Sequence, residues 1–101
     1  MKVKQALNML GLAMRAGKVT AGEGTVIQDI QKRQAALVII SEEASERTKK
    51  TVTNKCHSYD IPYRQFGAKA VLGHSIGKGP RTVLAIKDKN FATKIDQLLD
   101  E

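Results

Sequence analysis

Tryptophan is absent from this sequence, and cysteine, proline and aromatic residues are scarce. The 101 residues include one cysteine, two prolines, two tyrosines and two phenylalanines. A single thiol cannot form a disulfide within the chain, so we expect a reducing, cytoplasmic setting. So few aromatic side chains also argue against a surface that binds single-stranded nucleic acid by stacking.

Long apolar runs are missing as well. None approaches the roughly 20 residues that a membrane helix needs, so we expect no membrane segment. The basic N-terminus leads into an apolar stretch that contains Asn8 and meets Arg15, without a clean cleavage site, which argues against a signal peptide. With 42% hydrophobic and 27% charged residues, the composition is typical of a folded globular protein. The length predicts one domain over residues 1–101, and we expect a monomer.

Acidic residues are missing from two long stretches of the chain. Residues 1–22 hold four Lys or Arg and residues 61–87 hold five, with no Asp or Glu in either stretch, and the whole chain carries a net charge of +7. An excess this local predicts a one-sided positive surface for a polyanion such as nucleic acid. A globular protein that is merely basic is the alternative.

Helical and strand-like patterns alternate along the whole chain. We predict a first helix from Val3 that ends before Gly17, a second that residues 22–25 open, a third from Ser45 that ends before Pro62, a short one over residues 68–72 and a last one from Asn90. Strands are predicted at residues 18–21, 35–40, 63–66 and 82–87 between them. The order αβαβαβαβα predicts an α/β fold in which helices cover both faces of a four-stranded sheet. Gly17 is expected to end the first helix in a left-handed conformation, while Ser45 and Asn90 are expected to cap the third and the last.

The residues that catalysis or metal binding would need are also few. No nucleophile elbow, P-loop or complete dinucleotide fingerprint occurs. Cys56 falls on the inward stripe of a predicted helix, which favours a buried structural thiol. His57 and His74 lack the paired spacing of a metal site. We therefore predict no catalytic residue, no metal and no cofactor, and the weaker alternative is a small enzyme that uses the acidic loop Glu42–Glu43.

Two glycine-rich segments are the candidate binding elements. Residues 22–25 open a helix directly after a strand, where the first free amides of the helix can meet an incoming oxygen. Residues 73–80 contain three glycines beside the cations Lys78 and Arg81, which suit phosphate groups. A tight turn and a flexible connection are the alternative interpretations of these two segments.

Four stretches of the chain follow a familiar pattern. Leu7–Lys18 (LNMLGLAMRAGK) resembles the start of bacterial YlxQ-type proteins, which belong to the wider family of L-seven-Ae and L-thirty-e ribosomal proteins. Residues 34–44 resemble the central strand and acidic loop of that family, residues 61–63 its next strand, and residues 72–78 its Leu-Gly-x-Ala-x-Gly loop. The resemblance covers residues 3–99 in order.

This resemblance implies a three-layer α/β/α sandwich around a mixed four-stranded sheet. It also implies RNA binding, and the best-known target of the family is the kink-turn, an internal bulge in duplex RNA flanked by tandem sheared G·A pairs. The family reads those pairs with a Gly-x-Asn-Glu sequence followed by a lysine. The matching positions here are Gly22, Gly24, Thr25 and Gln28, so only the first glycine is retained.

The second loop follows the family more closely. Ser75 replaces the usual alanine, Ile76 supplies the apolar residue that packs on bulged nucleotides, and Lys78 matches the YlxQ-type pattern. Together the charges and the resemblance predict an RNA-contacting set made of Lys18, Gly22, Glu23, Gly24, Thr25, Gln28, Lys32, Gly73, Ser75, Ile76, Gly77, Lys78 and Arg81.

The sequence therefore predicts a non-enzymatic RNA-binding protein, either ribosome-associated or bound to another structured RNA. The alternative is a protein-interaction module on the same fold with weak or non-specific RNA binding. The substitutions at the base-reading helix favour that alternative, whereas the acid-free stretches oppose it.

Overall fold

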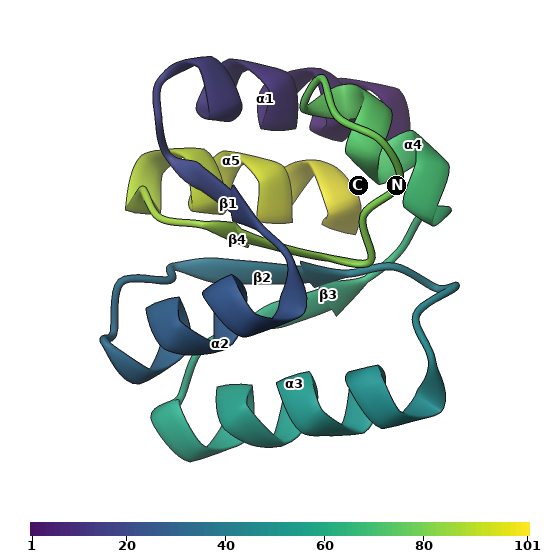
Figure 1. The fold of residues 1–101 in the computed structure, drawn as a ribbon. Coiled ribbons are helices and arrows are strands. Elements are labelled where there is room, and N and C mark those ends of the chain that lie inside the picture. The colour runs from purple at the N-terminus through teal and green to yellow at the C-terminus, as the bar shows by residue number, and fades with distance from the viewer.

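Five helices surround one four-stranded sheet in the computed structural model, which describes residues 1–101 (Figure 1). The helices are α1 (Val3–Arg15), α2 (Glu23–Gln31), α3 (Glu46–Tyr59), α4 (Lys69–Ser75) and α5 (Lys89–Asp100). The strands are β1 (Val19–Ala21), β2 (Leu37–Ile40), β3 (Tyr63–Gln65) and β4 (Val83–Ile86). The predicted order αβαβαβαβα is confirmed. None of the five helices is both long and apolar enough to cross a bilayer.

The sheet is mixed, as the resemblance implied. Its strand order is β1-β4-β2-β3, with β2 parallel to β3 and with β4 antiparallel to both of its neighbours. The two central strands, β2 and β4, are buried at every position. Both of their faces are covered, which explains why each reads as an unbroken apolar run in the sequence.

Helices cover the sheet on both sides. Figure 1 shows α1, α4 and α5 on one face and α2 with α3 on the other. One hydrophobic cluster joins the first group of helices to Ile39 and Leu84, and a second cluster joins α2 and α3 to Val38 and Val83. Adjacent residues of a strand point to opposite faces, so each central strand contributes to both clusters. The result is a three-layer α/β/α sandwich.

The helix ends match two of the three predictions made for them. Gly17 has φ +73°, and the Ser45 hydroxyl accepts a hydrogen bond from the Thr48 amide at 3.1 Å. The predicted cap at Asn90 is wrong. The Asp88 carboxylate accepts from the Phe91 amide at 3.0 Å, because α5 begins at Lys89 and leaves Asn90 inside the first turn.

The second glycine-rich segment forms a shorter loop than the sequence indicated. α4 continues to Ser75, so Gly73 is a buried helical residue. A Cβ atom at Gly73 would lie 1.9 Å from the carbonyl oxygen of Gly79, so a glycine is needed for the returning loop to pass against the helix. The loop proper runs over residues 76–82.

This close approach predicts that Gly73→Ala destabilises the protein. The new methyl group meets backbone rather than a movable side chain. We therefore expect the free energy of unfolding to fall by about 1–3 kcal/mol or more. Chemical denaturation followed by circular dichroism measures the change.

Gly24→Ala is the matched control. A Cβ atom at this exposed helical position has no heavy atom within 4 Å, so alanine should be neutral or stabilising by up to about 1 kcal/mol. Equal stability of the two variants would contradict the packing role assigned to Gly73.

Candidate functional site

Strands β1 and β2 end, and strand β4 begins, at the same end of the sheet. The Gly22 amide, just after β1, donates to the carbonyl oxygen of Val83 at 3.0 Å. The Ser41 amide, just after β2, donates to the carbonyl oxygen of Thr82 at 2.8 Å. The segments 22–25, 41–48, 67–69 and 76–82 therefore meet at this end, which we call the loop end.

A buried serine joins two of these segments. Ser41 is fully buried, and its hydroxyl donates to the carbonyl oxygen of Gly67 at 2.8 Å while accepting from the Glu43 amide at 3.0 Å. The Glu42 amide donates to the same Gly67 carbonyl at 3.0 Å. The turn after β2 is thus fixed against the chain that follows β3.

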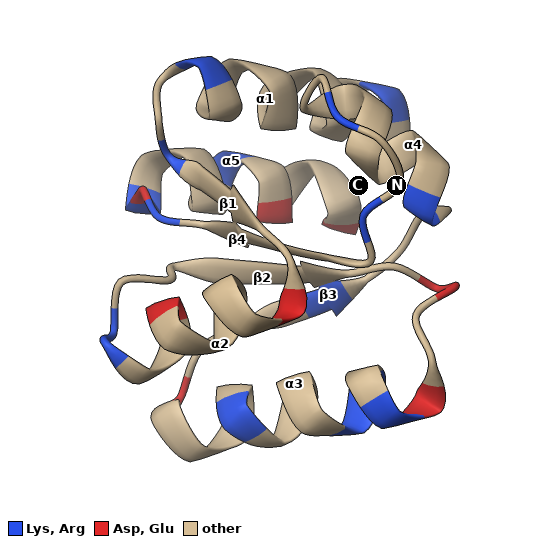
Figure 2. Ribbon diagram, in the orientation of Figure 1, with Lys and Arg blue, Asp and Glu red and all other residues tan.

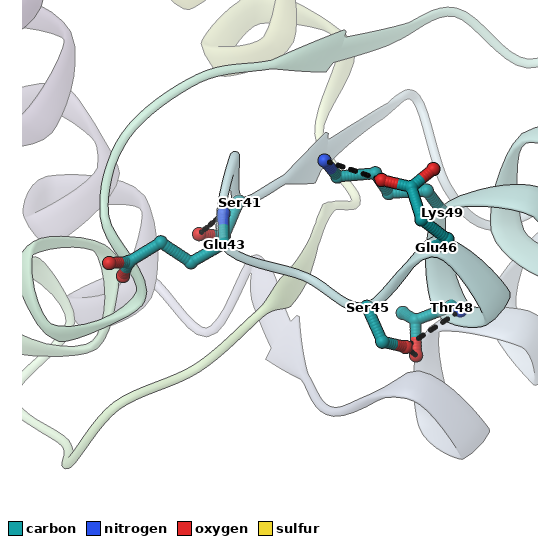
Figure 3. A network of polar contacts seen from close by, with 6 residues as sticks. All are labelled: Ser41, Glu43, Ser45, Glu46, Thr48 and Lys49. Carbon is teal, nitrogen blue, oxygen red and sulfur yellow. Dashed lines mark hydrogen bonds and ion pairs between the residues drawn. The ribbon is translucent and has the colours of Figure 1, made fainter.

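The acidic loop also has a structural role. One carboxylate oxygen of Glu43 accepts from the Lys69 amide at 2.8 Å, at the first residue of α4. Figure 3 shows the Glu43 side chain extending away from the group formed by Ser45, Thr48 and Lys49. The carbonyl oxygen of Lys69 in turn accepts from the Arg81 amide at 3.0 Å. Glu43 therefore anchors α4 beside the 76–82 loop, which leaves little support for the enzyme alternative.

The start of α2 lies against the start of α3. The Thr48 hydroxyl donates to a carboxylate oxygen of Glu23 at 2.7 Å. Gly22, with φ +101°, precedes α2 and has no side chain that could cap the helix. No side chain therefore accepts a hydrogen bond from the first amides of α2 in the manner of a cap. Gly24, Thr25 and Gln28 are all exposed. A ligand can therefore approach the backbone and these short side chains without displacing a cap.

Two cations of the second loop have different surroundings. Lys78 is exposed, and its side chain takes part in no ion pair or hydrogen bond. The Arg81 guanidinium donates to the carbonyl oxygens of Gly79 at 3.2 Å and Pro80 at 2.9 Å, and so fixes its own loop. Sequence reasoning missed Lys69, an exposed cation that the contacts described above bring to the same end. Its position in the first turn of a short helix gave no signal.

Acidic residues share the loop end with these cations. Glu23, Glu42, Glu43 and Glu46 all lie there, and Glu46 pairs with Lys49 at 3.6 Å. Figure 2 shows blue and red residues on both ends of the molecule. The prediction of a one-sided positive surface is therefore wrong, because the fold brings acids from residues 23–46 beside the acid-free segment 61–87.

Lys18 and Lys32 do not lie at the loop end. The carbonyl oxygen of Lys18 accepts from the Lys87 amide at 2.8 Å, beyond the far end of β4. Lys32 follows the last turn of α2, about 15 Å along the helix from Gly22. Arg81 and Lys87 stand at opposite ends of β4, and six residue steps of extended chain separate them by about 20 Å. The predicted set is thus divided between two ends of the sheet.

Ile76 does not present the apolar surface expected of it. Only 6% of the residue is exposed, because its side chain packs into the core cluster beneath α1 and α4. Leu12 and Val71 are the exposed apolar residues nearby, at 48% and 44%, and they line a groove of about 480 Å³ between α1 and α4. An apolar contact at this side of the loop is therefore available from those two residues.

The thiol and the imidazoles show no catalytic arrangement. Cys56 is fully buried, and burial raises the pKa of its thiol to about 11, so the reactive thiolate is scarce near neutral pH. His57 meets the Tyr63 ring edge-on, with ring centroids 5.6 Å apart. No group of three or more His, Cys, Asp or Glu residues is arranged to hold a metal ion.

Comparison with known proteins gives a consistent result. Residues 4–95 match the model of the Ribosomal protein L7Ae/L30e/S12e/Gadd45 family. The chain is 50% identical over 92 residues to the RNA-binding protein YlxQ of Bacillus subtilis, covering 91% of this chain and 92% of that protein.

Two solved structures share the fold. A protein of unknown function from Bacillus halodurans superimposes with a TM-score of 0.93 at 43% identity, covering 95% of this chain and 97% of the other. The 15.5kD RNA binding protein of Giardia lamblia superimposes with a TM-score of 0.80 at 19% identity, covering 97% of this chain and 91% of the other.

The fold and the loop end define a small α/β/α sandwich that gathers its exposed loops at one end of a mixed sheet. The chain belongs to the Ribosomal protein L7Ae/L30e/S12e/Gadd45 family, which consists of ribosomal and related proteins that are not enzymes. This membership confirms the family resemblance found in the sequence.

The contacts of Ser41 predict that Ser41→Ala loosens the loop end. The change removes a donor to Gly67 and an acceptor from Glu43 in a fully buried site. We expect the free energy of unfolding to fall by about 1–3 kcal/mol. We also expect faster amide exchange at residues 42–44 and 67–69, measured by hydrogen–deuterium exchange.

Ser58→Ala, at an exposed position of α3, is the control and should change stability by less than about 0.5 kcal/mol. Unchanged exchange at both segments in Ser41→Ala would show that the hydroxyl does not hold them together.

Proposed function

We propose that this chain is a non-enzymatic RNA-binding protein that docks its loop end on a bent or bulged RNA. Family membership and the 50% identity to an RNA-binding protein support RNA as the ligand. The proposed target is a structured RNA of kink-turn-like shape, ribosomal or otherwise, bound by a monomer.

One observation carries the proposal of this site. The uncapped start of α2 and the 76–82 loop, more than 50 residues apart in sequence, open onto the same end of the sheet through the contacts of Gly22 and Ser41 with β4. An uncapped helix start offers free amides to an oxygen of the RNA backbone. Lys78 offers an unpaired cation to a phosphate from the neighbouring loop.

The other residues of the loop end have supporting roles in this proposal. Thr25 and Gln28 can donate to and accept from base edges, while Gly22 and Gly24 let the backbone come close. A protein that recognises RNA in this way uses bulges and splayed nucleotides, because the grooves of intact A-form duplex offer little to side chains.

Gly73, Ser75 and Gly77 act through the loop rather than by contact with bases. Gly73 allows the loop to pass, and the Ser75 hydroxyl donates to the carbonyl oxygen of Leu72 at 2.6 Å within α4. Gly77 holds the left-handed turn that follows the helix, with φ +75°. These three residues set the position from which Lys78 reaches the ligand.

The direct test compares three RNAs by calorimetric titration. They are a kink-turn RNA, the same RNA with its G·A pairs changed to Watson–Crick pairs, and a plain duplex of equal length. The proposal requires the kink-turn to bind more tightly than the other two. Equal affinity for all three would mean general electrostatic attachment, and no binding at moderate salt would favour the protein-interaction alternative.

Lys78→Ala is predicted to weaken binding of the kink-turn RNA by roughly fivefold and to lower the slope of log affinity against log salt by about one phosphate contact. The lost charge is unpaired in the free protein, so folding should be unaffected.

Lys94→Ala is the control for this variant, since it removes the same charge from an exposed position of α5. If Lys78→Ala gives the affinity and salt slope of Lys94→Ala, Lys78 is not part of the interface.

A further inference from the structure

A hollow lined by cations lies at the end of the sheet opposite the loop end. Its volume is about 380 Å³, and its lining consists of Gly17, Lys18, Arg33, Gln34 and Lys87. None of these residues is apolar or acidic. They come from three separate parts of the chain, namely the turn after α1, the turn after α2 and the residue that follows β4.

The ends of α1 and α2 do not require these cations as caps. The Gly17 and Lys18 amides donate to the carbonyl oxygens of Met14 and Ala13, each at 2.9 Å. The turn after α2 repeats this arrangement, with the amides of residues 33 and 34 donating to residues 30 and 29 at 3.0 and 2.8 Å. Backbone amides thus satisfy the terminal carbonyls of both helices, and the cationic side chains remain available.

Arg33 occupies a position that ordinarily favours glycine. Its φ is +57°, and it stands at the same place after α2 that Gly17, with φ +73°, occupies after α1. A left-handed conformation is strained for a residue with a side chain. One guanidinium nitrogen donates to the carbonyl oxygen of Tyr59 at 3.1 Å, with the group 5.4 Å from the centre of the Tyr59 ring. The remaining donors of the guanidinium are free, because it has five.

The other two cations are also poorly paired. The Lys18 side chain takes part in no ion pair or hydrogen bond. Lys87 lies 3.9 Å from a carboxylate oxygen of Asp29, whose other oxygen accepts from the Thr20 hydroxyl. The ends of α1 and α2 each contribute a partial charge of about −0.5. Together with the Asp29 carboxylate they offset about two of the three positive charges around the hollow, and a positive charge of about one remains.

We propose that this hollow is a second binding site, and that its ligand is a phosphate group. Lys18 and Lys87 neutralise the phosphate charge, Arg33 donates from its planar guanidinium, and Gln34 adds an amide donor. In the RNA complex the phosphate belongs to a second backbone segment, about 20 Å from the loop end, and this part rests on the proposed function. The phosphate site itself does not depend on that function.

The first experiment uses inorganic pyrophosphate as the probe. Titration at low salt, followed by amide chemical shifts in NMR, should move the signals of Gly17, Lys18 and Gln34 along saturable curves. The double variant Lys18→Gln/Lys87→Gln should weaken this binding by about tenfold or more. Lys50→Gln/Lys94→Gln removes the same number of charges from exposed positions of α3 and α5 and should leave the curves unchanged.

Either of two results would overturn the phosphate site. One is the absence of saturable shifts at these amides in the wild-type protein. The other is equal pyrophosphate affinity in the two double variants. Thermal unfolding of each double variant checks that the fold is intact. If loss of the contact between Lys87 and Asp29 unfolds the protein, the single variant Lys18→Gln replaces the double variant in the pyrophosphate titration.

The second experiment repeats the titration with the kink-turn RNA and distinguishes the source of the phosphate. We expect shifts at both ends of the sheet, and we expect Lys18→Gln/Lys87→Gln to lose affinity while keeping the shifts at residues 22–28 and 76–81. RNA shifts confined to the loop end would overturn the RNA part of the proposal. Pyrophosphate binding without any RNA binding would contradict the proposed function and leave a site for a free phosphate compound.

Discussion

The antiparallel pairing of β2 with β4 is the interaction on which the rest of the structure depends. Both strands are buried at every position, and each outer strand pairs with only one of them, β1 with β4 and β3 with β2. The helices cover the two faces of this pair in two separate hydrophobic clusters. Because β4 runs against β1 and β2, its first residues meet the chain that leaves those strands, and the loop end is a consequence of this direction.

Most of the fold could be predicted from local patterns. The apolar runs at residues 35–40 and 83–86 mark the central strands, and the glycine after α1 marks a helix end. The exact start of α5 could not be predicted locally, because Asp88 and Asn90 are both good caps. Only the tertiary position of β4 selects Asp88 as the cap. The extent of α4 depends on the close passage of the loop at Gly73, a long-range contact with no local signature.

The site was harder to predict because proximity in sequence differs from proximity in space. Lys18 lies four residues before Gly22, yet a single strand carries the two to opposite ends of the sheet. Ile76 lies in the glycine-rich segment 73–80, yet its side chain faces the core. Lys69 belongs to the loop end only through its backbone contacts with Glu43 and Arg81. In each case the decisive contact joins segments that are distant in the chain.

The charge of the protein is therefore divided between two ends, each with its own surroundings. At the loop end most of the acids are held by hydrogen bonds or an ion pair, which leaves Lys78 as the free cation of its loop. Ultraviolet cross-linking of a kink-turn RNA to the protein, read by mass spectrometry, tests the assignment of the loop end most directly. The account predicts cross-links within residues 22–28 and 76–81, and cross-links confined to α5 or to the outer face of α3 would contradict it.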